Sequence, residues 1–240
     1  MNPLGAREIP RPPRIVQARS SPMELEGIRG RVLFPGPQQG PWPPFERLAE
    51  SVATGGGAKD LHTHSGEEVV NYVLAGAVLH WDSEDHAVEL NEGAVTLLRA
   101  TDEIRHDIVP KLRSDARWVS VTLHWTGAVA GPETPYQFGR GVAETSREPG
   151  LRVLRVVGAS TPVRSALGLD MSDWTFSQSS SREVALDPAR RLVAYVLDGT
   201  VEIEGRTVAS GGGILAEGVS SLRVAASTGA RMLLMSVPAP

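Results

Sequence analysis

Three histidines and one glutamate in the first half of the chain have residue types and a spacing that can bind a metal ion. His62 and His64 flank Thr63, Glu68 follows four residues after His64, and His106 comes later. Residues two apart in a strand point to the same face, so His62 and His64 can direct two imidazoles at one point. A later strand can bring His106 to that point. Imidazole suits zinc, copper, iron and nickel, and an added carboxylate extends the choice towards iron or manganese.

The other three histidines do not extend this group. His80 can make a hydrogen bond to a metal-binding residue or simply pack within its strand. His86 lies in a polar stretch and is interpreted as a solvated turn residue, and His124 as a partly exposed strand residue. The alternative is that the histidines of the group are unrelated surface or core residues. This is the more common case when a His-x-His pair stands alone.

The elements that must position these side chains are strands. From about residue 60 the sequence consists of short apolar runs, rich in β-branched residues and separated by turn residues, and no window has a long helical period. The heptapeptide 72–78 nearly repeats at 195–201, an offset of 123 residues. Because this is about half the chain, we predict a duplicated β-domain, with barrels at 45–137 and 150–237 packed face to face.

The segment 1–44 differs from the rest in its proline content. Ten of the 18 prolines lie in the first 45 residues, and proline removes a backbone donor. We predict an irregular arm with little helix that packs on the body through apolar residues, with its first dozen residues disordered.

Composition excludes several classes of function. The chain has no cysteine, which excludes disulfides, thiolate metal sites and thiol nucleophiles. A net charge of −4 without a basic cluster argues against direct binding of nucleic acid. No apolar stretch approaches the length of a membrane span and no secretory signal is recognisable, so we expect a cytoplasmic protein without a membrane partner.

The wider pattern around the histidines resembles the two-part metal motif of the cupin superfamily, and within it the pirin family. The first part is the segment HTHSGEEVVNYVLAGAVLHWDS, which begins at His62. The second part is NEGAVTLLRATDEIRHDIVP, which contains Gly93 and His106. Strong similarity covers about residues 60 to 137, and the second half agrees mainly in strand order. The resemblance implies a bicupin fold, all-β with two tandem barrels.

The resemblance also implies a ligand set that this chain does not fully keep. Three of the four pirin ligands correspond to His62, His64 and His106, but the fourth, a glutamate, falls on Ile108. Glu68 occupies the carboxylate position of the general cupin motif and is our candidate fourth ligand. The alternative is a three-histidine site completed by water. The second barrel has no histidine, and the offset of 123 places Ala185 and Asp187 at the first two ligand positions, so we expect one metal ion per chain.

Two functions from different classes follow from the resemblance. The first is a mononuclear dioxygenase of the quercetin 2,3-dioxygenase type, with iron as the expected metal, zinc, nickel, manganese or copper as alternatives, and a small flavonol-like aromatic substrate. The second is a non-enzymatic, metal- or redox-responsive protein that binds a regulatory protein partner. A metal-free structural cupin is a third alternative, and the sequence leaves open whether the protein is an enzyme at all.

Overall fold

Every regular element of the described chain is an antiparallel β-strand. The structure is a computed structural model. It describes residues 14–35, 40, 42–54, 61–111, 114–125, 135–144 and 149–239. The predicted disorder of the first dozen residues concerns a segment outside this range. The absence of helix among the described residues confirms the all-β prediction.

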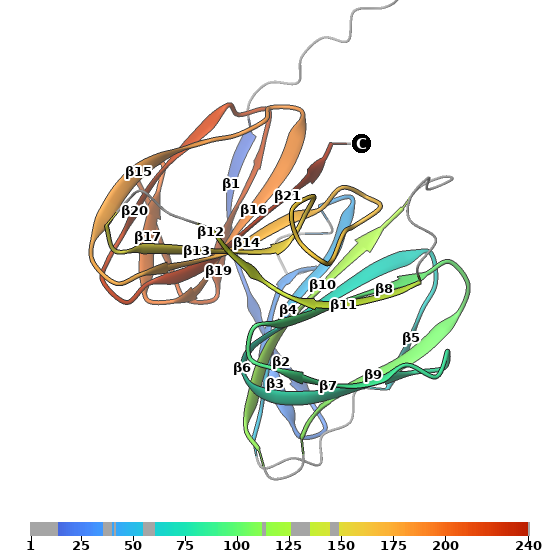
Figure 1. Cartoon of the computed structure of the whole chain (residues 1–240). Coiled ribbons are helices and arrows are strands. Elements are labelled where there is room, and N and C mark those ends of the chain that lie inside the picture. Colours follow the sequence, from blue (N-terminus) through green and yellow to red (C-terminus); the bar gives the residue numbers. More distant parts are fainter. Residues whose placement is uncertain are drawn as a thin grey trace, which may run out of the picture.

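The strands of the first half form a curled sheet, drawn in blue to yellow-green in Figure 1. Its main path runs in the order β11 (Tyr136–Arg140), β8 (Ala94–Ala100), β6 (Glu67–Asp82), β10 (Ala116–His124), β4 (Phe45–Ala53), β3 (Ile28–Phe34) and β2 (Ser21–Leu25). Three further strands extend it: β5 (His62–His64), β7 (Ala87–Asn91) and β9 (Ile104–Pro110). Because β6 is long enough to pair with β8 and β10 at one end and with β7 and β9 at the other, it belongs to both walls of the first barrel.

The second half, together with the N-terminal strand β1, forms two sheets, drawn from yellow to red with β1 in blue in Figure 1. The larger runs in the order β1 (Arg14–Arg19), β19 (Gly212–Glu217), β16 (Arg190–Asp198), β21 (Arg231–Pro238), β14 (Asp170–Phe176), β13 (Leu151–Val157) and β12 (Val142–Glu144). The smaller runs in the order β15 (Ser180–Ala185), β20 (Ser221–Ala226), β17 (Thr200–Ile203) and β18 (Arg206–Ala209). Their facing sides enclose a buried apolar core, so the second half is also a barrel.

Residues 14–34, predicted as part of an irregular arm, instead form three strands. β1 pairs with β19 of the second barrel, whereas β2 and β3 join the first barrel beside β4. Pro22 is compatible with this arrangement because β2 lies at the edge of its sheet, where a missing N–H breaks no ladder. The proline content therefore excluded helix correctly but did not exclude edge strands.

The two barrels share a core, and the alternation of β6 shows how. Val70, Tyr72 and Leu74 belong to a buried cluster that also contains residues of the second barrel, including Tyr195. Val73, between them, belongs to the interior of the first barrel. Since successive side chains point to opposite faces, each of the two repeated heptapeptides contributes one face to its own barrel and one to the interface.

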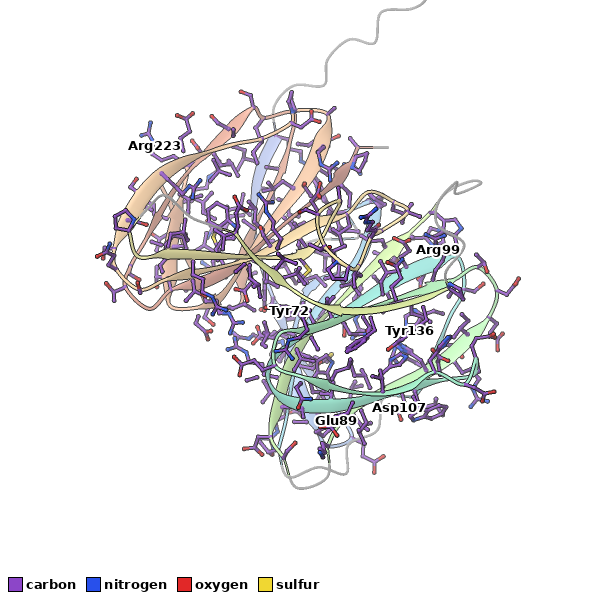
Figure 2. All side chains as sticks on the ribbon, viewed as in Figure 1. Tyr72, Glu89, Arg99, Asp107, Tyr136 and Arg223 are labelled. Carbon is purple, nitrogen blue, oxygen red and sulfur yellow. The ribbon has the colours of Figure 1, made fainter. Side chains whose placement is uncertain are left out.

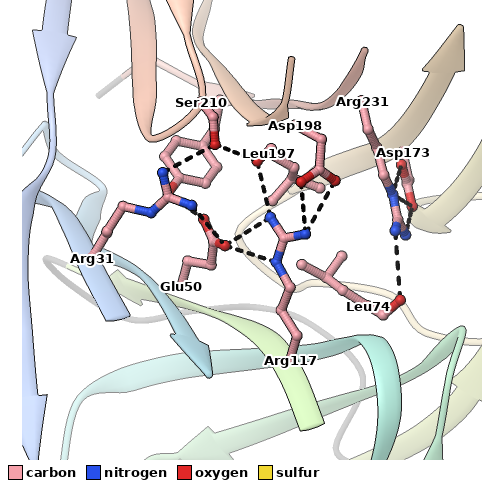
Figure 3. Close-up of polar contacts among 10 residues, drawn as sticks. Arg31, Glu50, Leu74, Arg117, Asp173, Leu197, Asp198, Ser210 and Arg231 are labelled. Atoms are coloured by element: carbon pink, nitrogen blue, oxygen red, sulfur yellow. Dashed lines mark hydrogen bonds and ion pairs between the residues drawn. The ribbon is translucent and has the colours of Figure 1, made fainter. Parts of the chain in front are cut away.

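A pair of similar polar networks crosses this interface (Figure 3). Tyr195 Oη donates to Glu50 Oε2 at 2.6 Å, and Arg117 Nε donates to Glu50 Oε1 at 2.8 Å. In the counterpart, Tyr72 Oη donates to Asp173 Oδ2 at 2.8 Å, and Arg231 Nη2 donates to the same oxygen at 2.7 Å. The two tyrosines and the two carboxylates are each 123 residues apart, which supports duplication of one domain.

Candidate metal centre

The pairing of β5 with β9 brings the three predicted histidines together. His62 lies opposite His106 in the register of these strands, and His64 lies on the same face of β5 as His62. The three ring centroids are 4.5–5.0 Å apart. One ring nitrogen of each residue lies within 4.8 Å of the others, and this is the one such group found among the described residues.

The geometry of the ring nitrogens fits a divalent metal ion. His62 Nε2 and His106 Nε2 are 3.1 Å apart, and His64 Nε2 is buried without a hydrogen-bond partner. Two nitrogens that each lie about 2.1 Å from one tetrahedral or octahedral ion are about 3.0–3.4 Å apart. A shared ion would therefore satisfy nitrogens that the protein itself leaves facing one another.

The protonation state of His106 also suits metal binding. Burial, together with the neighbouring histidines, lowers the pKa of His106 from 6.5 to about 2. The imidazole is consequently neutral at physiological pH, which is the form that offers a lone pair to a metal ion.

Glu67, which was not among the predicted site residues, holds one of these histidines in place. Its Oε2 contacts Nδ1 of His64 across the turn between β5 and β6. Such a carboxylate fixes the tautomer and the ring orientation, so that Nε2 is left to coordinate. Glu67 directly precedes Glu68, so the sequence offered two adjacent carboxylates near His64. A turn separates both from His64, and the sequence does not show which of the two that turn directs at the histidine.

Glu68, the predicted fourth ligand, lies away from the histidine group and faces the second barrel. Its Oε1 accepts hydrogen bonds from Arg99 Nη2 at 3.1 Å and from Ala166 N at 2.8 Å, and Oε2 accepts one from Ser165 Oγ. The side chain is fully buried. The reason is the alternation of β6: Glu68 shares the face of Val70 and Tyr72, which is the interface face.

Ile108 takes the place where the resemblance implies a glutamate. It lies two residues after His106 on β9 and is 1% exposed. It packs in the core of the first barrel with residues that include Val78, Leu90 and Trp118. Among the described residues, no carboxylate joins the three histidines.

A small cavity of about 30 Å³ adjoins the histidines. Apart from the histidines, it is lined by Met23, Arg47, Ala49, Ser51, Val69, Asn71, Ser120 and Thr122. Arg47 Nη2 lies 3.1 Å from the sulfur of Met23 at its edge. Asn71 accepts a hydrogen bond from Ser120 at 2.6 Å, while its buried Nδ2 has no partner. The cavity thus offers one amide donor and room for about one or two water-sized molecules.

Two aromatic contacts extend from the site towards the surface. His80 is buried, its Nε2 donates to Asp82 Oδ2 at 3.2 Å, and its ring lies 5.5 Å from the His106 ring. The ring of Tyr136, labelled in Figure 2, stacks on both His80 and His86. His86, interpreted from sequence as a solvated turn residue, is half-buried, because its Nδ1 contacts the Asp82 carboxylate at 3.0 Å and its ring stacks on Tyr136.

The second barrel has apolar side chains where the first has histidines. Val184 pairs with Leu222 across β15 and β20, as His62 pairs with His106 across β5 and β9. Leu186, two residues after Val184, follows as His64 follows His62. This pairing shifts the correspondence by one residue from Ala185 and Asp187, which the repeat offset predicted, because the chain from Val184 to Tyr195 in β16 is one residue longer than the chain from His62 to Tyr72 in β6. The side chains of Val184, Leu186 and Leu222 cannot coordinate a metal ion.

The fold is that of a bicupin, and the part of the chain that the structure describes contains one candidate metal centre, the three-histidine group of the first barrel. Two family models match: residues 44–124 match the pirin model, and residues 168–237 match the model described as the quercetinase C-terminal cupin domain. Together they cover more than half of the chain. The chain belongs to the pirin family.

A curated relative agrees with this assignment. The Pirin-like protein At1g50590 of Arabidopsis thaliana is 29% identical over 167 residues. The match includes 65% of this chain and 53% of that protein, so the chain spans about half the length of the relative.

Solved structures show the same fold at low identity. Quercetin 2,3-dioxygenase from Acinetobacter baumannii has a TM-score of 0.80 at 18% identity, over 93% of this chain and 79% of that one. GK1651 from Geobacillus kaustophilus has a TM-score of 0.81 at 22% identity, over 94% and 96%. The bacterial pirin YhhW from Escherichia coli, in complex with nickel(II), has a TM-score of 0.78 at 16% identity, over 95% and 100%. In the part of the chain that the structure describes, no helix has the length and apolar character to cross a membrane.

Proposed function

We propose that the chain is a metal-dependent oxygenase of the quercetinase type, with one divalent ion, iron in the first place, bound by His62, His64 and His106. The observation that carries the proposal is the convergence of three imidazoles, with two Nε2 atoms 3.1 Å apart and a third buried without a partner. Zinc, nickel, manganese and copper are the alternatives, since imidazole suits most of them. Because Glu68 is engaged elsewhere, the ion keeps three protein ligands and open positions.

The residues around the site have separate tasks in such a reaction. When bound, the metal ion supplies Lewis acidity and open coordination positions. Glu67 holds His64 through Nδ1 and so fixes the direction of its Nε2. The Nδ2 group of Asn71 is a donor at the wall of the cavity and can hold an oxygen atom of a small ligand. Ile108 keeps the side of the site nearest the core dry.

The size of the cavity adds a condition on the substrate. Sites for drug-sized molecules usually have volumes of about 300–1,000 Å³, and the cavity beside the histidines has about 30 Å³. A flavonol can reach the metal only if the wall opens. Met23 is the side chain best placed to move, because β2 is an edge strand.

Oxygen uptake by iron-loaded protein in the presence of quercetin tests this function. We expect uptake by the wild-type chain and faster uptake by Met23→Ala, because removal of that side chain enlarges the entrance. Leu25→Ala is the matched control, since Leu25 lies on the same strand, is exposed and does not line the cavity. Failure of both the wild-type and the Met23→Ala protein to consume oxygen would contradict the oxygenase proposal.

A second candidate is a non-enzymatic, metal-responsive protein that binds a regulatory partner. The observation in its favour is that two adjacent residues of β6 connect the candidate metal site with the second barrel. Glu67 contacts His64, and Glu68 contacts residues 165 and 166. One equivalent of bound metal without oxygen uptake would favour this candidate. Absence of bound metal would favour a structural cupin.

A further inference from the structure

The two polar networks that cross the interface differ in the number of carboxylates that their arginine binds (Figure 3). In the first network, Arg117 donates to Glu50 at 2.8 Å and to Asp198 at 2.9 Å. In the second, Arg231 forms an ion pair with one carboxylate among the described residues, that of Asp173, at 2.7 Å. The second guanidinium therefore has one carboxylate partner where the first has two.

The repeat shows which residue of the second network lacks a carboxylate. The carbonyl oxygens of Leu197 and Leu74, which are 123 residues apart, accept from the arginines of the first and second networks at 2.9 Å and 3.5 Å. Asp198 follows Leu197, whereas Ala75 follows Leu74. Ala75 is exposed and its side chain has no acceptor. The place of one carboxylate beside Arg231 is thus not filled from this position of the chain.

A second replacement on the same side leaves space between the barrels. Arg31 pairs with Glu50 across β3 and β4, as Leu154 pairs with Asp173 across β13 and β14. The Arg31 guanidinium occupies the space beside the first network, where Nη1 donates to Ser210 Oγ at 3.0 Å. Because leucine is shorter than arginine, the equivalent space beside the second network is open. A groove of about 1010 Å³ lies there.

The charged side chains that line this groove have a net positive charge. They are Arg140, Arg152, Arg231, Glu92 and Asp173. The ion pair between Asp173 and Arg231 is neutral as a whole, which leaves two arginines against one glutamate. The groove is therefore locally positive in a chain whose net charge is −4, and a positive concave surface favours an anionic ligand.

The arginines of the groove have donors left for such a ligand. Arg152 is exposed, and its side chain has no hydrogen bond or ion pair within the described part of the chain. Arg140 Nη2 donates to the backbone oxygen of Glu92 at 2.6 Å, which uses one of the five donors of its guanidinium. Nη1 of Arg231 has the long contact with a carbonyl oxygen, whereas its Nε and Nη2 bind the carboxylate.

We propose that the groove between the barrels binds a small organic anion through its carboxylate or phosphate groups. One anionic group takes the place that Asp198 has in the first network and binds Nη1 of Arg231. Arg152 binds the anion from the opposite wall, and the body of the ligand lies against Leu154. Charge-assisted hydrogen bonds of this kind are about twice as strong as neutral ones. The site is separate from the histidine site and does not depend on a bound metal.

Titration calorimetry of the full chain with succinate and with inorganic phosphate tests the proposal and distinguishes the two anionic groups. Binding of either probe at one equivalent is expected, and Arg152→Gln should weaken it about tenfold, since a charge-assisted hydrogen bond is lost. Arg29→Gln is the matched control. Arg29 pairs with Val52 as Arg152 pairs with Thr175, so it has the equivalent place in the repeat, but it does not line the groove.

A second variant fills the site from within the chain. Ala75→Asp should place a carboxylate beside Arg231, as in the first network, and so weaken binding of the probe at least tenfold while the protein stays folded. Ala87→Asp adds the same charge at an exposed alanine outside the groove and should bind as the wild type does. The His62→Ala/His64→Ala protein should also keep the wild-type affinity.

Four results would overturn the proposal. The first is that neither probe binds to the wild-type chain. The second and third are equal affinities of the Arg152→Gln and Arg29→Gln proteins, and an affinity of Ala75→Asp equal to that of Ala87→Asp. The fourth is loss of binding in the His62→Ala/His64→Ala protein, which would assign the anion to the histidine site.

Discussion

The His64 ring is oriented by a carboxylate on one nitrogen and left open on the other. Glu67 contacts Nδ1, while the buried Nε2 faces the other two histidines. We expect Glu67→Ala to weaken binding of a divalent metal about 10- to 100-fold, because the ring loses its fixed tautomer and orientation. Competition with a chelator measures the affinity. Glu103→Ala is the control, since Glu103 is exposed on the loop before β9, and equal affinities of the two variants would contradict the assigned role.

The low pKa of His106 gives the metal-free protein a defined pH dependence. Folded His106 binds no proton until about pH 2, whereas the unfolded residue binds one below about pH 6.5. The unfolded state therefore gains protons first on acidification, and stability falls as the pH drops below 6.5. Between pH 7.5 and 5.5 we expect the metal-free wild type to lose about 1.4 kcal/mol more than His106→Gln. Urea unfolding at the two pH values measures this difference, and parallel losses in both proteins would contradict it.

The sequence was sufficient to select the three histidines but not the carboxylates. His62 and His64 are two apart, which places them on one face in any strand, and the later strand motif supplied His106. Glu67 and Glu68 follow a turn at Ser65 and Gly66, and Gly66 has a φ of +70°. The geometry of this turn decides which of two adjacent glutamates faces the histidines, and spacing alone contains no such information.

At the scale of elements, β6 connects the candidate metal site to the second barrel through Glu68. Its carboxylate is buried and accepts from Arg99, Ser165 and Ala166. We expect Glu68→Gln to leave the metal content unchanged and to lower the free energy of unfolding by about 2–3 kcal/mol, because Arg99 then lacks its buried charged partner. Elemental analysis and urea unfolding of the same preparation measure both quantities. A loss of metal with unchanged stability would instead make Glu68 the fourth ligand.

The strand repeat was recognisable from sequence, whereas its register was not. Tyr72 and Tyr195 occupy equivalent places, and their turn glycines, Gly76 and Gly199, both have positive φ values near +72°. At Gly76 a Cβ would lie 2.0 Å from a carbonyl oxygen, so glycine is required there. The correspondence slips by one residue at β15, because loops between strands tolerate changes in length that the strands do not.

The strands β1, β2 and β3 show the same limit for the N-terminal segment. Their prolines lie in connections or on the edge strand β2, so the proline content was compatible with sheet. Composition predicted where helix could not form. The pairing of β1 with the second barrel depends on long-range contacts that composition does not encode.

At the scale of the whole molecule, the paired networks join the barrels into one unit. Glu50 is 1% exposed and accepts hydrogen bonds from Tyr195, Arg117 and Arg31. We expect Glu50→Gln to lower the free energy of unfolding by about 2 kcal/mol. This loss is smaller than that for a fully buried ion pair, because Arg117 keeps Asp198 as a second partner. Urea unfolding measures the change, with Glu46→Gln on the same strand as the control. Equal stabilities of the two variants would show that the network does not hold the barrels together.

We propose that each chain binds one metal ion, and that the three histidines of the first barrel alone bind it. Elemental analysis of the purified wild type, His62→Ala/His64→Ala and His124→Ala proteins tests it most directly. His124 is an exposed histidine of the same barrel and is outside the metal group. We predict one equivalent of a divalent metal in the wild type and in His124→Ala, and none in the double variant with its fold retained. One equivalent retained by the double variant, or two in the wild type, would contradict this assignment of the metal ligands.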